Sequence, residues 1–111
     1  MNNNIAAAEI LESAAFVIGT GHHCKNTTAI NQDGESVSPN NFYAVAWCAL
    51  GALKEALTAF SKGAIVYNDA KYALEWIIGS SVLNWNDAPE RTAAEVEAAM
   101  LQAAANLRGE A

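Results

Sequence analysis

One stretch constrains the fold of this chain more than any other, because no charged residue occurs between Phe42 and Leu53. The stretch reads FYAVAWCALGAL and is rich in alanine and leucine, which are strong helix formers. A helix that is apolar on every side has to be covered by protein on nearly all sides. The sequence therefore predicts that a helix with its cap at Ser38, Asn40 or Asn41 includes Phe42 to Phe60 and lies at the centre of the fold.

Three further segments have apolar residues at three- and four-residue spacing, which is typical of amphipathic helices. The first ends at Gly19, the second has its cap at Asn68 or Asp69 and stops at Gly79, and the third begins at Thr92. Thr92 and Glu95 have the spacing of a capping box, in which each side chain satisfies a backbone N–H near the other. We therefore expect a mainly α fold, a compact bundle of about four helices.

The segment between the first helix and the central helix has no helical character. Within it Thr27–Ile30 can pair with Glu35–Ser38 around Asp33-Gly34, a dipeptide that suits a tight hairpin turn. We expect a small β-hairpin or loop here, and a hairpin of two strands needs to pack on the helices to be stable.

Length and charge limit the classes of function. The 111 residues are enough for one domain, residues 1–111, and 52% hydrophobic against 16% charged residues leaves apolar surface for a partner, so we expect a homo-oligomer. A net charge of −6 argues against binding a nucleic-acid polymer. The chain shows no signal peptide, membrane span or disulfide framework, which predicts a cytoplasmic protein that does not enter a membrane.

Cys48 and Gly51 lie inside the predicted central helix. A free cysteine there is most often a small buried apolar side chain, but a thiol beside His22 or His23 would be the minimal arrangement for acyl transfer. We expect Cys48 several residues beyond the helix cap, where the helix dipole does little to activate it. Gly51 costs about 1 kcal/mol relative to alanine, so we expect a neighbouring backbone to approach it closely.

His22, His23, Cys24 and Cys48 are residue types that bind zinc. Three of them are adjacent in the chain and lack the spacing that brings ligands onto one ion. We therefore expect no metal site and no other cofactor, and we interpret this segment as a polar loop.

The segment NWNDAPERTAAEV, residues 84–96, combines turn formers with one large aromatic residue. Turn and capping chemistry explains its Asn, Asp, Pro and Thr residues but not Trp85. An indole beside amides and a carboxylate can stack on a planar polar ligand, although Trp47, Trp76 and Trp85 would also suit the core. The predicted ligand-binding residues are Trp85, Asn86, Asp87, Arg91, Trp47, His22 and His23.

Two stretches, AWCALGAL at 46–53 and NWNDAPERTAAEVEAAM at 84–100, together resemble a family of small uncharacterised bacterial and phage proteins. In that family a Cys-x-x-Gly-Ala-Leu helix is followed by a Trp-Asn-Asp turn that leads into a Thr-x-x-Glu-Val helix. The segment TTAINQDGESV resembles the extended segment before the first of these helices, so the resemblance covers the chain from about Thr27. It implies a fold but no activity, and it points to Cys48, Gly51, Trp85, Asn86 and Asp87 as positions to test.

Small size, acidity and the lack of a clear catalytic set favour a non-catalytic binding protein. We expect a phage or mobile-element accessory that captures a host protein or a small polar ligand. A nucleotide-derived signal is one ligand class that suits Trp85 and a helix N-terminus. Two alternatives remain, a thiol enzyme that uses Cys48 with His22 or His23, and a structural homo-oligomeric subunit.

Overall fold

A computed structural model describes residues 3–109 of the chain and confirms the mainly α fold. Five helices and one pair of short antiparallel strands form a compact molecule of about 41 × 31 × 21 Å. Along the chain the elements are α1 (Asn3–Gly19), β1 (Ala29–Ile30), β2 (Ala46–Trp47), α2 (Ala49–Ala59), α3 (Ala64–Ile78), α4 (Val82–Asp87) and α5 (Ala93–Arg108).

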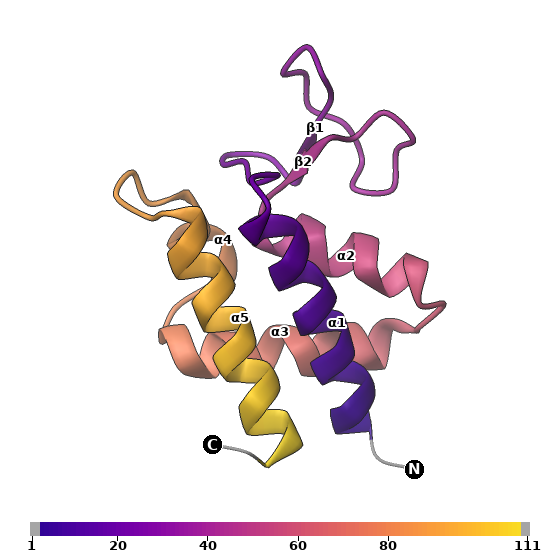
Figure 1. Ribbon diagram of the computed structural model, residues 1–111, viewed down its shortest axis with the longest axis vertical. Helices are drawn as coiled ribbons and strands as arrows, with labels where there is room; N and C mark the ends of the chain where they lie inside the picture. The colour runs from indigo at the N-terminus through magenta and orange to yellow at the C-terminus, as the bar shows by residue number, and fades with distance from the viewer. Residues whose placement is uncertain (1–2, 110–111) are drawn as a thin grey trace.

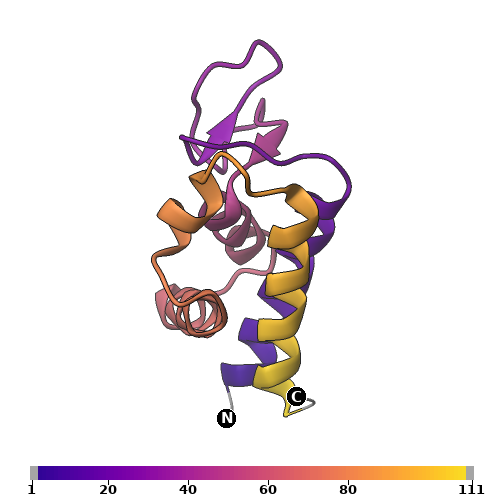
Figure 2. The ribbon, with the colours of Figure 1, turned by 90° about the vertical axis from the view of Figure 1, so that its left-hand side faces the viewer.

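Two layers of helices enclose the core. The long helices α1 and α5 lie antiparallel in one layer, and α2, α3 and α4 form the other (Figures 1 and 2). Small buried residues such as Ala7 and Ala14 of α1 and Ala103 of α5 allow the helices to pack closely. Arg108, the last residue of α5, donates two hydrogen bonds to the carboxylate of Glu12 in α1, at 2.9 and 2.8 Å.

The predicted central helix is wrong in its first half, because α2 begins only at Ala49. The backbone before it is extended: Val45 N–H donates to the Ile30 carbonyl at 2.8 Å, and Cys48 N–H donates to the Thr28 carbonyl at 3.1 Å. These bonds to a distant segment replace the local bonds of a helix. The second half of the uncharged stretch, Ala49 to Leu53, is buried as expected.

A β-hairpin region lies between α1 and α2, but its strand pairing differs from the prediction. A turn does form at Gly34, whose φ of 82° suits glycine, and an isolated antiparallel bridge joins Ile30 to Ser36. The strand pair itself is β1 with β2, in which Ala29 is opposite Trp47. We call residues 31–45, which connect the two strands, the tip. The tip projects beyond the helices, at the end of the molecule away from the start of α1 and the end of α5 (Figures 1 and 2).

The boundaries of the later helices follow local signals in most cases. Gly79 ends α3 in the left-handed conformation, with its N–H on the Glu75 carbonyl, and Thr92 and Glu95 form the predicted capping box of α5. The predicted cap of α3 at Asn68 or Asp69 is wrong, because Gly63 is the N-cap and the helix begins at Ala64.

The predicted turn before α5 is also wrong in part, because it contains the short helix α4. The hydroxyl of Ser81 caps α4 by accepting from the Asn84 N–H. The turn formers Asn84, Asn86 and Asp87 are therefore helical, and the turn comes only after them, at Pro89.

Some large apolar side chains stay outside the core, as the composition indicates. On the outer side of α3, Ile65, Tyr72 and Trp76 are spaced at seven and four residues and are 67, 60 and 85% exposed. Among residues 3–109, no helix has the length and apolar character needed to cross a membrane.

Candidate functional site

The predicted site residues His23, Asn86 and Asp87 are brought together by the fold, but they bind one another. Asn86 is 0% exposed, and its Oδ1 accepts from the His23 ring Nε2 at 2.7 Å and from the Ala49 N–H at 3.0 Å. Its Nδ2 donates to the Cys24 carbonyl at 3.2 Å and to Asp87 Oδ1 at 2.9 Å. With both ends of the amide satisfied inside the protein, Asn86 links α4, the start of α2 and the loop after α1.

Asp87 and Lys25 fasten the same loop to the end of α4. Asp87 Oδ1 also accepts from the Asn26 N–H at 2.9 Å, and Lys25 Nζ donates to the Ala88 carbonyl at 2.6 Å and to the Pro89 carbonyl at 3.3 Å. These contacts connect residues about sixty positions apart in the chain. We therefore interpret this cluster as a structural connection between the two halves of the chain.

Trp85 and Arg91, two more predicted ligand residues, cover each other. The Arg91 guanidinium lies 4.4 Å from the centre of the Trp85 ring, and its Nε donates to the Trp85 carbonyl at 3.0 Å. Such a cation over an indole is itself a favourable contact. One face of the ring is thus occupied by the protein and is closed to a stacking ligand.

Trp47 and His22 hold the tip in place. The Trp47 indole N–H donates to the Pro39 carbonyl at 2.8 Å, and His22 Nδ1 lies 3.0 Å from the Val45 carbonyl. Trp47 is half-buried and His22 is exposed. These two hydrogen bonds hold the backbone before and after the exposed residues Phe42 and Tyr43.

The two thiols are buried and protonated at neutral pH. Cys48 is the N-cap of α2, where its Sγ accepts from the Gly51 N–H at 3.4 Å, so the prediction that it lies beyond the cap is wrong. Burial raises the pKa of Cys48, although the hydrogen bonds from the helix N–H groups act in the opposite direction. Burial, with smaller effects of Cys48 and Asp87, raises the pKa of Cys24 to about 11. Within residues 3–109, no group of three His, Cys, Asp or Glu side chains is placed to hold a metal ion.

We expect both thiols to react slowly with iodoacetamide at pH 8 in the folded protein. The thiolate is the reacting species, and a pKa near 11 against about 8.5 for a free cysteine makes Cys24 at least about a hundredfold slower in the native than in the denatured chain. Mass spectrometry of the timed reaction measures each rate. If Cys48 is alkylated as fast in the native chain as in the denatured chain, the prediction of a slow thiol is wrong and the thiol-enzyme hypothesis gains support.

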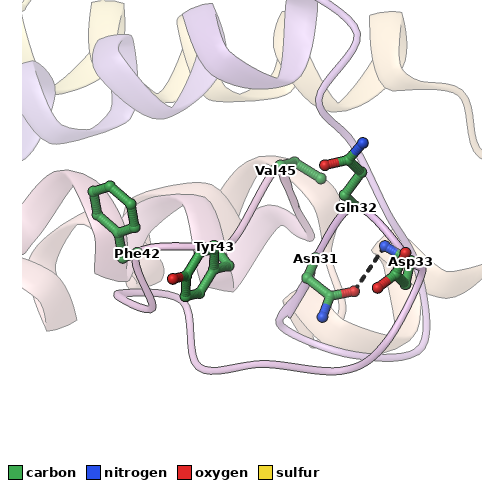
Figure 3. Close-up of a pocket in the computed structure, with 6 residues that line it drawn as sticks. All are labelled: Asn31, Gln32, Asp33, Phe42, Tyr43 and Val45. Carbon is green, nitrogen blue, oxygen red and sulfur yellow. Dashed lines mark hydrogen bonds between the residues drawn. The ribbon is translucent and has the colours of Figure 1, made fainter.

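A pocket of about 350 Å³ lies at the tip, and none of the predicted site residues lines it. Its amide and carboxylate side chains come from the turn after β1, and its aromatic and aliphatic side chains come from the segment that leads into β2 (Figure 3). The rings of Phe42 and Tyr43 meet edge to face, with centres 5.4 Å apart. The lining residues are Asn31, Gln32, Asp33, Phe42, Tyr43 and Val45.

Hydrogen bonds hold both walls of this tip pocket. Asn31 Oδ1 accepts from the backbone N–H groups of Asp33 and Glu35, at 3.0 and 2.9 Å, and the Tyr43 N–H donates to Asn41 Oδ1 at 2.8 Å (Figure 3 shows the first bond). The pocket therefore rests on ordered turns, although Phe42 and Tyr43 are 91 and 70% exposed.

The sequence did not indicate any of the six residues of the tip pocket as a site. Phe42, Tyr43 and Val45 were assigned to a helix, and residues 31–33 to the turn of the predicted hairpin. A signal was present: Ser38, Pro39, Asn40 and Asn41 are consecutive turn formers directly before the aromatic pair. This run favours a loop as much as a helix start.

Comparison with known proteins identifies one family. A family model described as "Family of unknown function (DUF6197)" matches residues 2–106, nearly the whole chain and more of it than the resemblance from Thr27 covers. No curated protein and no solved structure matches the chain. The paired motifs and the phage origin stay predictions.

Proposed function

We propose that this chain, which belongs to the DUF6197 family of unknown function, is a non-catalytic binding protein that uses the tip pocket as its contact surface. The observation that supports this most is the exposure of Phe42 and Tyr43 side by side on an ordered turn. Aromatic side chains are strongly favoured in the centres of binding sites, and water is a poor environment for them. Polar groups beside an apolar wall are the usual composition of a ligand pocket.

The ligand belongs to the class that the sequence predicts, a small polar group or a group on a host protein, but the site has moved from Trp85 to the tip. A nucleotide-derived ligand is less suited to the tip pocket than to the predicted site. Asp33 lines the pocket and Glu35 is bonded to Asn31, so the charged side chains at the pocket are negative and repel a phosphate.

A screen of small polar fragments by backbone amide NMR shifts tests this function. We expect the fragments that bind to shift the amides of residues 31–33 and 42–45, and we expect Tyr43→Ser to remove these shifts. Tyr72→Ser is the matched control, because Tyr72 is a similarly exposed tyrosine, on α3. Shifts confined to other parts of the protein, or no shifts with any fragment, would contradict the proposal.

The two alternative functions have less support. A thiol enzyme needs a base near the thiol, yet the His23 ring is bonded to Asn86 and the thiols have raised pKa values. A homo-oligomer stays a prediction, for which the exposed Ile65, Tyr72 and Trp76 on α3 provide apolar surface. Sedimentation equilibrium measures the molecular mass in solution, which distinguishes a monomer from a homo-oligomer.

A further inference from the structure

The charged residues in the segment that forms the tip pocket are all negative. Residues 26–53 contain Asp33 and Glu35 and no lysine or arginine. The flanking lysines are directed elsewhere, because Lys25 binds the carbonyls after α4 and Lys54 lies 5.9 Å from the centre of the Tyr67 ring. Within residues 3–109 the carboxylate of Asp33 has no hydrogen-bond or ion-pair partner, so it is available to a ligand.

The tip pocket has an aromatic pair on one wall and a carboxylate on the other, and both kinds of group attract cations (Figure 3). The faces of Phe42 and Tyr43 carry the negative part of the ring quadrupole and attract a positive group within about 6 Å. Asp33 adds a full charge, which an anion would have to approach at an energetic cost. A guanidinium suits this pocket, because its plane can stack on a ring of one wall while its positive charge is attracted by the carboxylate of the other.

The openness of the tip pocket favours a side chain on a larger partner over a free small molecule. Asn31 is half-buried, and the other five lining residues are all exposed. A free ligand would stay partly exposed in this open pocket and would bind weakly, whereas a partner protein would also cover the rim and Phe42 itself. The tip also projects from the helices, so a large partner can reach it (Figures 1 and 2).

We infer that the tip pocket receives an arginine side chain from a partner protein, with the guanidinium between the aromatic pair and Asp33 and with neighbouring partner residues over Phe42. This inference rests on the proposed function and specifies its ligand. Lysine is a weaker ligand of the same kind, because its ammonium is a point charge and cannot stack.

The test compares two peptides that differ only in charge. The first is acetyl-Gly-Leu-Arg-Leu-Gly-amide, and in the second citrulline, a neutral isostere, replaces arginine; N-acetyl-arginine methylamide serves as the single-residue probe. We expect the arginine peptide to shift the amides of residues 31–33 and 42–45 and to bind about tenfold more tightly than the citrulline peptide. Binding of the arginine peptide should weaken as salt is added.

Two variants test whether the negative charge of Asp33 causes the preference for arginine. We expect Asp33→Ser to remove most of the preference for arginine over citrulline, and its backbone N–H can still donate to Asn31. Glu9→Gln removes an equal charge from the exposed side of α1, so it should leave the preference unchanged. The rest of the amide spectrum reports that each variant is folded.

Results that differ from these expectations contradict either the inference alone or the proposed function as well. Equal binding of both peptides, or an unchanged preference in Asp33→Ser, overturns the inference while the proposed function stands on the fragment results. Binding of N-acetyl-arginine methylamide as tight as that of the arginine peptide overturns the protein partner in favour of a small cation. If neither the peptides nor the fragments shift the tip amides, the inference and the proposed function both fail.

Discussion

Replacing Gly51 with alanine lowers the free energy of unfolding by about 3 kcal/mol. A Cβ atom at Gly51 would lie 1.9 Å from the Thr28 carbonyl oxygen and 2.8 Å from its carbon. That carbonyl cannot easily move, because it accepts the Cys48 N–H at 3.1 Å. This geometry confirms the predicted close approach of a backbone to Gly51.

The sign of the effect makes the Gly51→Ala measurement decisive. Helix propensity alone would stabilise the variant by about 1 kcal/mol, since alanine replaces glycine inside a helix. Chemical denaturation measures the difference, and Gly63→Ala is the control. Gly63 has an ordinary φ of −96° and nothing beyond its chain neighbours within 4 Å of an added Cβ, so we expect a loss of at most about 1 kcal/mol, from the poorer N-cap that alanine makes. A Gly51→Ala variant as stable as the parent would mean that Thr28 does not lie against α2.

Replacing Asn86 with alanine lowers the free energy of unfolding by about 4 kcal/mol. The change leaves the Ala49 N–H and the Cys24 carbonyl without their side-chain partner in a buried place, and it also removes the hydrogen bond to His23. Each buried polar group left unsatisfied costs about 1–3 kcal/mol. The loss should be visible as a lower denaturation midpoint.

Asn84→Ala is the matched control for Asn86→Ala, because it changes the same residue type two positions earlier on α4. The Asn84 side chain is exposed, and the cap of α4 uses only its backbone N–H, so we expect a change within about 0.5 kcal/mol. Equal effects of the two substitutions would mean that Asn86 does not connect α4 to α2 and to the loop after α1.

The sequence named seven candidate ligand-binding residues but did not place them relative to one another. His23, Asn86 and Asp87 do meet, although His23 and Asn86 are 63 positions apart in the chain. Their residue types indicated hydrogen bonding, but a type does not reveal whether the partner is a ligand or the protein itself. Burial decides this, and burial depends on how α4 packs against α2.

By itself, the sequence determined the mainly α class, the single apolar face of α1, the end of α3 at Gly79 and the capping box at Thr92. The ends and the cap depend on hydrogen bonds between residues three or four positions apart, such as Gly79 with Glu75, and these can be inferred from a short window. Helical periodicity is equally local.

Only the tertiary structure decided where α2 begins, that Cys48 caps it, and that the exposed Phe42 and Tyr43 line one pocket with Asp33. These features depend on partners distant in sequence, because Val45 bonds to Ile30, Cys48 to Thr28 and Ala49 to Asn86. Local preference favoured a helix across the whole uncharged stretch. At its beginning the chain is extended instead, because the backbone N–H groups of Val45 and Cys48 donate to carbonyls of residues 28–30. The candidate site lies where long-range pairing overrode that preference.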